Sequence, residues 1–552
     1  MLKTFRRLFV LVTATASFTT LCESAPAATA ADTRPNIVVI LVDDLGFSDI
    51  GCYGSEINTP NLDQLAGDGL RFTQFYNNAR CCPTRASLMT GLHPHQVGIG
   101  HMTAPGNQPL RVEGPYQGFL NDNCVTVAQV LKTAGYHTFM TGKWHIGANS
   151  RDVWPLQRGF DHYYGGIDGA FNYFHPGGAQ GMTRDNGREK VGDDFYTTDA
   201  FTDEACRYIT DATEADDRPF FLYLAYNAPH WPVSPKVADF ERYRGKYKGG
   251  WKPLMEGRFA KQKELGLFGP EVEASQHEGP EWDTLKPKRR DNLDAIMAAY
   301  AGCIDSIDQN IGKLYAHLEA TGEADNTLIL FLSDNGACQE GGQLGNGSEA
   351  MVRNPPQGTN GVRLGHAWAN ACNTPFRLYK HFVHEGGMGT PFIAHWPAGM
   401  KGADRGGFVR HAAYLPDVMA TCVELASATY PDSVPPCVGK SLVASLQGGD
   451  EVIHTEPLYW EHEGNAAVRW GDWKLVRRYE QPWELYNIAT DRTELHDLAE
   501  KENAKRDEMI AMWEAWATEH GVAFPKRFDM YEHLQQLKAD REKAAKSTRA
   551  DG

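Results

Sequence analysis

The sequence lacks several features that mark particular classes of protein. After its first thirty residues, the 552-residue chain has no apolar run long enough to cross a bilayer, and it has no internal repeat. Its 54 lysines and arginines face 70 aspartates and glutamates, a formal charge of −16. These absences argue against a stable membrane span and against a nucleic-acid partner, which would need a basic surface. An anionic substrate would have to be attracted by a local group of cations.

Cysteine is also scarce. Eleven cysteines in so long a chain are too few for a disulfide scaffold, and they form no CxxC pair and no Cys/His zinc pattern. A few disulfides remain compatible with an oxidising compartment. The unusual feature is the adjacent pair Cys81-Cys82.

The N-terminus has the pattern of an export signal. A basic start is followed by an apolar stretch from Leu8 that is too short for a membrane helix, and residues 28–30 form a small-residue cleavage site. Cys22 raises the alternative of a lipoprotein anchor, although the bulky Leu21 precedes it. We expect a signal peptide over residues 1–30 and a secreted or periplasmic protein.

Four short apolar runs each end in polar residues suited to chemistry, and helical patterns lie between them. Near-continuous apolar runs are typical of strands buried on both faces, and strands that alternate with helices predict a mostly parallel sheet. We therefore expect an α/β fold, with a large, mostly parallel (mixed) sheet sandwiched by helices. Ligands of such sheets bind beyond the carboxyl ends of the strands, where all four polar clusters fall. The runs cover residues 36–42, 135–140, 220–226 and 327–332.

The texture changes after about residue 440, where short strand-like pieces are separated by glycine turns. We predict a large domain over residues 33–438 and a C-terminal α+β subdomain over 439–525, with a short antiparallel sheet and a helix from about Glu494 to Glu519. A charged tail over 526–552 completes the chain. Two long glycine-rich loops, 147–191 and 337–370, are candidates for walls of a substrate pocket.

The acidic residues at two strand ends offer only oxygen ligands. Asp43-Asp44 and Asp334-Asn335 contain no histidine or cysteine, a set that suits a hard divalent cation such as Ca²⁺ or Mg²⁺ and not zinc or copper. Each pair alone could simply be a turn that ends a strand. Two pairs in the same topological position favour a metal site.

Cys81 precedes a plausible helix. The fixed φ of Pro83 suits a first helical turn, and residues 84–90 continue the helix. A thiol just before that helix would be favoured as the thiolate by the helix dipole. A vicinal disulfide, or an ordinary buried cysteine pair, is equally compatible with this spacing.

Other polar residues at the strand ends are weaker candidates on their own. Lys143 and His145 are two residues apart, so in an extended loop both point to one side. His230, between prolines, is held stiffly for catalysis or merely ends a strand. We expect His93 and His95 to be structural, and nothing decides the role of His101.

Residues 81–91, Cys-Cys-Pro-Thr-Arg-Ala-Ser-Leu-Met-Thr-Gly, resemble the signature of the type I sulfatases of the alkaline phosphatase superfamily, Cys-x-Pro-Ser/Thr-Arg followed by Leu-x-Thr-Gly. Residues 142–145 resemble the family's Gly-Lys-Trp-His element, and Ala228-Pro229-His230 matches the position of its sulfate-binding histidine. Residues 377–380 resemble the lysine element of bacterial arylsulfatases. The likeness spans about residues 34–525, including pieces at 460–465 and 485–487.

The resemblance implies a sulfatase whose catalytic domain is the predicted residues 33–438. It would hydrolyse sulfate monoesters of a small molecule or a carbohydrate to an alcohol or phenol and inorganic sulfate. A formylglycine-generating maturation enzyme would convert Cys81 to 3-oxoalanine (formylglycine), whose hydrate attacks sulfur and forms a covalent sulfo-enzyme. One Ca²⁺, with Mg²⁺ as the less favoured ion, would be bound. Its implied ligands are Asp43, Asp44, Cys81, Asp334 and Asn335.

The same resemblance implies the catalytic roles. His230, with Lys380 beside it, would protonate the leaving oxygen, and His145 would take a proton from the second hydroxyl to expel sulfate. Arg85 and Lys143 would hold the hydrate. Two alternatives stay open: a phosphonate monoester or phosphodiester hydrolase of the same superfamily, and a catalytically silent protein that binds sulfated glycans.

Overall fold

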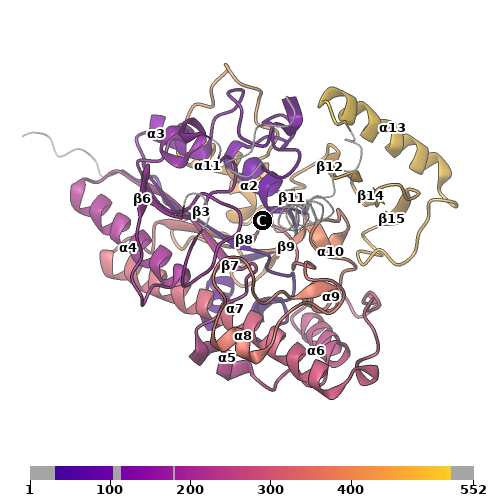
Figure 1. Cartoon of the computed structure of the whole chain (residues 1–552). Coiled ribbons are helices and arrows are strands. Elements are labelled where there is room, and N and C mark those ends of the chain that lie inside the picture. Colours follow the sequence, from indigo (N-terminus) through magenta and orange to yellow (C-terminus); the bar gives the residue numbers. More distant parts are fainter. Residues whose placement is uncertain (1–31, 104–113, 149, 178–180, 524–552) are drawn as a thin grey trace, which may run out of the picture. The chain divides into compact units, whose positions relative to one another are not determined.

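A mixed sheet of eleven strands organises the chain (Figure 1). The strand order is β10-β2-β9-β8-β1-β7-β3-β4-β5-β6, and β11 also pairs with β2. Pairing is antiparallel around β9 and at β4-β5-β6, and parallel elsewhere. The strands are β1 (Asn36–Asp43), β2 (Leu70–Tyr76), β3 (His137–Lys143), β4 (His162–Gly166), β5 (Met182–Arg184), β6 (Gly187–Glu189), β7 (Phe220–Pro229), β8 (Thr327–Ser333), β9 (Gly389–His395), β10 (Phe408–Val409) and β11 (Ala413–Tyr414).

The four predicted apolar runs are β1, β3, β7 and β8, and they are neighbours in the order β8-β1-β7-β3. All three pairings among them are parallel. Their carboxyl ends therefore meet at one edge of the sheet. The predicted fold class and the convergence of the four polar clusters at one edge are confirmed.

Helices cover both faces of the sheet. Successive side chains of β1 point to opposite faces and all are buried, so each face needs a covering layer. Ile37, Val39 and Leu41 pack with α2, α3, α11 and α12, whereas Val38 and Ile40 pack with α1, α4, α5, α6, α7 and α9. The helices are α1 (Pro60–Gly67), α2 (Cys81–Thr90), α3 (Val127–Thr133), α4 (Thr197–Ala215), α5 (Val237–Tyr243), α6 (Trp251–Glu264), α7 (Pro287–Thr321), α8 (Glu349–Arg353), α9 (Gly365–Cys372), α10 (Glu385–Met388), α11 (Pro416–Leu425), α12 (Val443–Leu446) and α13 (Asn503–Glu519).

A second sheet has four antiparallel strands in the order β12-β13-β14-β15, and α13 packs against it. The strands are β12 (Leu458–His462), β13 (Asn465–Trp470), β14 (Trp473–Arg477) and β15 (Glu484–Asn487). The predicted helix from Glu494 was wrong in its first turns, because α13 begins at Asn503. Asp491 accepts hydrogen bonds from the amides of Leu495 and His496, which holds this stretch as turns.

The loop predicted over residues 147–191 contains three short strands, β4, β5 and β6, so the prediction of one long irregular loop was wrong. The sequence of β4 did not indicate a strand, because it ends in two glycines and glycine is uncommon in strands. A Cβ added at Gly165 would lie 1.8 Å from the carbonyl oxygen of Gly142 on β3. Only glycine permits this approach of the two strands.

The computed structural model describes residues 32–103, 114–148, 150–177 and 181–523, and those from Arg34 on belong to one compact unit. The predicted signal peptide and charged tail lie outside the described residues. No described helix is both long and apolar enough to span a membrane. The division between residues 438 and 439 stays a prediction; Leu442 and Leu446 pack into the core under the large sheet.

Candidate active site

The two acidic pairs come together at the carboxyl ends of β1 and β8, where all four side chains are buried. The backbone N–H of Asp44 donates to Asp334 Oδ1 (3.2 Å), and Asn335 Nδ2 donates to Asp44 Oδ1 (2.7 Å). We call Asp43, Asp44, Asp334 and Asn335 the carboxylate cluster. The structure thus brings together the four predicted oxygen ligands.

Asp44 has a left-handed backbone, with φ of 71°, which is uncommon for a residue with a side chain. Tyr300, on α7, donates its hydroxyl hydrogen bond to the carbonyl of Asp44 (2.8 Å), and its oxygen also lies 2.8 Å from Asp49 Oδ2. Arg258 donates to the other oxygen of Asp49 (2.5 Å). This buried chain of contacts supports the turn that carries Asp44.

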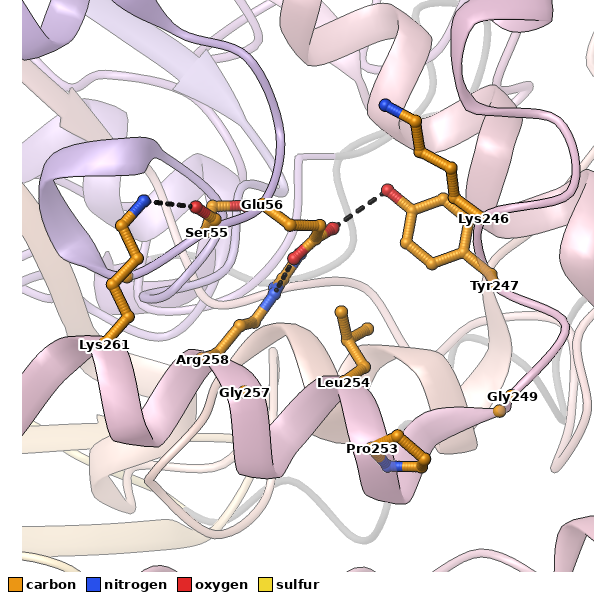
Figure 2. Close-up of a pocket in the computed structure, with 12 residues that line it drawn as sticks. Ser55, Glu56, Lys246, Tyr247, Gly249, Pro253, Leu254, Gly257, Arg258 and Lys261 are labelled. Carbon is orange, nitrogen blue, oxygen red and sulfur yellow. Dashed lines mark hydrogen bonds and ion pairs between the residues drawn. The ribbon is translucent and has the colours of Figure 1, made fainter.

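Arg258 extends this support to a surface cavity of about 390 Å³ between the loop after β1 and α6 (Figure 2). It makes a bidentate ion pair with Glu56, to which Tyr247 also donates. The cavity is lined by Gly54, Ser55, Glu56, Lys246, Tyr247, Gly249, Gly250, Pro253, Leu254, Gly257, Arg258 and Lys261. None of these is a predicted site residue.

Three oxygens of the carboxylate cluster are buried without a hydrogen-bond partner among the described residues: Asp43 Oδ1, Asp44 Oδ2 and Asn335 Oδ1. Buried polar atoms are normally partnered, because an unpartnered one costs free energy. Oxygen atoms from carboxylates and an amide form the donor set that a hard divalent cation prefers. The residues present therefore fit such a cation.

Three predicted cations form ion pairs with the carboxylates, and Arg85 lies near two of them, Asp334 and, at 3.6 Å, Asp43. Lys143 Nζ donates to Asp43 Oδ2 (2.5 Å) and Lys380 Nζ to Asp44 Oδ1 (2.7 Å). The third predicted cation is Arg85, which donates to Asp334 Oδ2 from Nε (3.1 Å) and from its terminal nitrogen (2.8 Å). All three cations are buried.

The charges move the carboxyl pKa values in opposite directions. Burial alone would raise the pKa of Asp43, but Lys143, His230 and Arg85 outweigh it and hold that pKa below its ordinary value. Burial and the charge of Asp43 raise the pKa of Asp334 well above its ordinary value. The raised pKa of Asp334 reflects the repulsion between two buried carboxylates that lie close together, which a bound divalent cation would relieve.

Cys81 is the first residue of α2. The prediction that it lies just before the helix was therefore wrong, because the helix includes it. A hydrogen bond from Cys82 lowers the thiol pKa well below its ordinary value despite burial, and Lys143, Lys380 and His145 lower it further. Cys81 and Cys82 are free thiols, as are the other eight described cysteines. The vicinal disulfide is therefore absent from this structure.

His145 lies beside both thiols, with Nε2 3.2 Å from Cys82 Sγ. Its φ of 56° is left-handed, so the prediction of an extended loop was wrong here. A Cβ at Gly169 would lie 2.1 Å from His145 Nε2, which places this part of the 147–191 segment directly against the ring. Burial, with Lys143 nearby, lowers the His145 pKa to about 4, so the imidazole is neutral and can accept a proton.

His230 follows β7, and its Nε2 lies 3.6 Å from Asp44 Oδ2. Its Nδ1–H donates to the carbonyl of Trp231 (2.6 Å), and Tyr173 donates to the backbone carbonyl of His230 (2.6 Å). These bonds fix the ring so that Nε2 faces the carboxylate cluster. Burial lowers the His230 pKa.

Two candidate functional residues at the wall of the site were not identified from the sequence. Arg80, directly before Cys81, forms an ion pair with Glu340 (3.2 Å). Burial would raise the pKa of Glu340, but Lys380, Arg80, His230 and a further arginine lower it to about 2. The only signals in the sequence were the neighbour position of Arg80 and the location of Glu340 in the predicted wall loop 337–370.

A second group was also missed, on the turn between β12 and β13. Glu463 lies 3.1 Å from His101 Nε2 and 3.0 Å from Nδ1 of His381, the neighbour of Lys380. Asn465 Nδ2 donates to His381 Nε2 (3.2 Å), so Nδ1 carries the ring proton and donates to Glu463. A protonated Nδ1 is not free to bind a metal, although His381, His462 and Glu463 lie close enough to form a metal site.

His93 and His95 contact the small domain. His95 Nε2 lies 2.8 Å from Glu461, and the His93 ring packs edge-on against Trp516. These contacts are those expected of structural residues.

Comparisons with known proteins point to one family. The family model described as Sulfatase matches residues 35–426. An uncharacterized sulfatase of Schizosaccharomyces pombe is 32% identical over 541 residues, 89% of this chain and 94% of that protein. An arylsulfatase of Klebsiella aerogenes is 33% identical over 66% of this chain and 81% of its own length. The solved structure of Ps i-CgsB in complex with k-i-k-neocarrahexaose has a TM-score of 0.65 and 27% identity, covering 92% of this chain and 98% of that one.

Proposed function

The chain belongs to the sulfatase family and is a sulfuric ester hydrolase, and from this premise we propose that it cleaves sulfate monoesters with a formylglycine derived from Cys81 and one bound Ca²⁺. The observation that carries the proposal is the set of three buried oxygens without a hydrogen-bond partner, in a cluster whose Asp334 is ion-paired with Arg85 of α2, the helix that begins at Cys81. They offer a cation the oxygen ligands it needs next to residue 81.

In this proposal the carboxylate cluster and residue 81 hold the cation. When bound, the cation supplies positive charge to an oxygen of the sulfuryl group and favours ionisation of a nearby hydroxyl. The hydrate of formylglycine would supply that hydroxyl as nucleophile, and a second hydroxyl whose deprotonation forms the aldehyde C=O while the C–O bond to the sulfated oxygen breaks and sulfate leaves. A serine at position 81 would lack this second hydroxyl.

The side chains around residue 81 then share the remaining work. Arg85 and Lys143, each already ion-paired with a carboxylate, hold the hydrate and offset the charge that develops near it. His145, neutral because of its lowered pKa, accepts the proton of the second hydroxyl. This step expels sulfate and restores the aldehyde.

His230 serves as the acid for the leaving oxygen. Its Nδ1–H is committed to a carbonyl, so the proton is delivered from Nε2 of the imidazolium form, which the nearby Asp44 favours. Lys380, 2.7 Å from Asp44, adds positive charge on the same side. The leaving group is therefore expected to lie over His230 and the residues that follow it.

The proposed substrate is a sulfated small molecule or carbohydrate. The Klebsiella aerogenes relative is described as an arylsulfatase, and the structural neighbour Ps i-CgsB was solved in complex with k-i-k-neocarrahexaose. The proposal also includes export through the signal over residues 1–30 and a formylglycine-generating maturation enzyme that acts on Cys81.

The test combines a mass spectrum with two activity assays. Trypsin cleaves after Arg80 and Arg85, so the peptide Cys81–Arg85 of natively expressed protein should show the mass loss that replacement of a thiol by an aldehyde produces. Calcium-loaded enzyme should then hydrolyse 4-nitrophenyl sulfate faster than an aryl phosphonate ester. A preference for the phosphonate would indicate the rival hydrolase, and an unmodified thiol without activity would indicate a silent glycan-binding protein.

A matched variant tests the nucleophile itself. Cys81→Ser should lose turnover by at least about a thousandfold, roughly 4 kcal/mol in activation free energy. The variant keeps a hydroxyl but cannot expel sulfate as a hydrate can. Full turnover of this variant would overturn the mechanism.

A further inference from the structure

One guanidinium at the wall of the site has no carboxylate partner. Four other lysine and arginine side chains around the site each lie within 3.2 Å of a carboxylate. No carboxylate among the described residues lies within ion-pair distance of Arg363, whose guanidinium carbon instead lies 4.0 Å from the centre of the Trp231 ring. In a chain with a net charge of −16, an unpaired arginine beside a catalytic histidine needs an explanation.

The backbone holds Arg363 firmly against the segment that carries His230. The amide of Val233 donates to the carbonyl of Val362 (3.0 Å). On the other side, Arg363 and Asn346 exchange a pair of backbone hydrogen bonds (2.7 and 3.0 Å). The position of Arg363 is therefore set by the same local structure that positions the catalytic segment.

The side chains of His230, Trp231 and Arg363 follow one another along the wall, with the His230 and Trp231 rings tilted by 34°. The rings of His230 and Trp231 lie 4.8 Å apart, and the guanidinium covers Trp231. Stacking uses the face of a guanidinium and leaves the N–H donors on its edge free. The indole Nε1 of Trp231 is buried and has no hydrogen-bond partner among the described residues. The guanidinium donors of Arg363 and this indole N–H therefore have no acceptor among the described residues.

The charge of the wall is also unbalanced. Lys380, Arg80, His230 and Arg363 together lower the pKa of Glu340 to about 2 against the effect of burial. Glu340 makes its ion pair with Arg80. An additional negative group brought by a ligand would find a free cation at Arg363.

We propose that Arg363 binds a second oxyanion of the substrate, a sulfate or a carboxylate on the part of the molecule that leaves with the freed hydroxyl. The inference rests on the proposed function, because His230 then protonates the leaving oxygen and the leaving group extends over Trp231 towards Arg363. The substrate class is a multiply anionic saccharide. A guanidinium edge forms paired hydrogen bonds with sulfate or carboxylate oxygens.

The test uses matched pairs of saccharides that differ in one anionic group. Each pair contains a hexose monosulfate and the same sugar with either a second sulfate or a uronic carboxylate. For the sugar that is cleaved best, kcat/KM should be at least about tenfold higher for the doubly anionic member, roughly 1.4 kcal/mol. The sulfate and carboxylate arms identify which oxyanion is recognised.

The variants locate the preference. In Arg363→Met and Arg363→Gln, measured together so that the result does not depend on the folding of one variant, the ratio should fall to within about twofold of unity. The control is Arg353→Met on α8, where the arginine is exposed and ion-paired with Glu241 and Glu349; it should keep the ratio. Retention of the ratio in both Arg363 variants would overturn the proposal, as would an equal loss on both members of a pair.

The outcomes for the inference and for the function differ. If the matured, calcium-loaded enzyme hydrolyses 4-nitrophenyl sulfate and monosulfated sugars but shows no preference for a second anion, the inference fails and the proposed function stands. If it hydrolyses no sulfate ester at all, the proposed function fails and the inference fails with it.

Discussion

Two buried groups of charged side chains differ in how their oxygens are used. In the carboxylate cluster three oxygens have no hydrogen-bond partner. In the second group, which we call the interface cluster (Glu385, Lys474, Arg492 and Glu494), Lys474 Nζ lies 2.8 Å from both glutamates, and Arg492 Nε donates to Glu385 Oε2 (3.2 Å). The amide of Glu385 donates to Glu494 Oε2 (3.0 Å). In the interface cluster each glutamate oxygen lies within 3.2 Å of a cationic nitrogen or a backbone amide, although Glu494 Oε1 has only its ion pair with Lys474. Similar residues thus hold the structure together where each oxygen has a donor or a cation, and leave room for a ligand where an oxygen has neither so close.

The largest expected effect is a loss of catalytic rate at the carboxylate-cluster site. His230→Ala should lower kcat by about 10²–10⁴-fold on a saccharide sulfate, because a poor leaving group needs a proton donor. The loss should be smaller on 4-nitrophenyl sulfate, whose leaving group needs little protonation. Steady-state kinetics on both substrates give the result, and equal losses would contradict the role of His230 as an acid.

The next largest effect is a loss of stability when the interface cluster is disrupted. Lys474→Met leaves Glu385 and Glu494 buried without their shared cation, and should lower the free energy of unfolding by about 3–5 kcal/mol. Denaturant unfolding measures this change. Lys252→Met, which removes an exposed pair with Glu281, is the control and should cost no more than about 1 kcal/mol. Equal effects of the two substitutions would mean that the interface cluster does not stabilise the fold.

Calcium sharpens the contrast between the clusters. At a concentration a hundredfold above its Kd, Ca²⁺ should stabilise the folded protein by about 2.7 kcal/mol, because it binds the native carboxylate cluster and not the unfolded chain. Thermal unfolding with calcium and with a chelator measures this gain. Asp44→Ala should abolish it, whereas Glu385→Gln should retain it. A gain that survives Asp44→Ala would place the ion elsewhere.

The smallest effect concerns pH. Burial would raise the pKa of Glu385, but Lys474, Arg492 and Arg469 outweigh it and lower that pKa. The unfolded chain therefore binds a proton more readily than the folded one, so the stability contributed by Glu385 is complete above its ordinary pKa and is lost as the pH falls below it. Glu385→Gln should make the decline in unfolding free energy between about pH 5 and about pH 3 shallower. Glu508→Gln on α13, at an exposed pair, should leave the slope unchanged.

The central strands and their polar ends could be predicted because each is encoded locally. The runs that became β1, β3, β7 and β8 are apolar on both faces, and a parallel arrangement necessarily brings their carboxyl ends to one edge. The acidic pairs, Lys143 and His230 follow directly from that arrangement. No knowledge of side-chain contacts was needed.

The loop 337–370 was predicted as a wall of the site, but the side-chain pairs that form the wall could not be predicted, because they depend on contacts between distant segments. Arg80 meets Glu340, and Arg363 meets Trp231, only after the loops pack, and no periodic pattern marks such a pair. The prediction of a helix from Glu494 failed for a related reason. The side chain of Asp491 accepts hydrogen bonds from backbone amides and holds turns in place of the helix that the apolar spacing favoured. The glycine-rich β4 is a strand because of its close approach to β3, which no propensity reports.

The burial of α2 limits when the proposed conversion of Cys81 to formylglycine could take place. All ten residues of this helix are buried, and Cys81 is 1% exposed. In the proposed maturation, the modifying enzyme would have to reach Cys81 before the chain closes around it, so the rate of conversion would compete with the rate of folding. A molecule that folds first keeps its thiol permanently. In an expression host where folding outpaces modification, the yield of well-folded protein would overstate the yield of working enzyme.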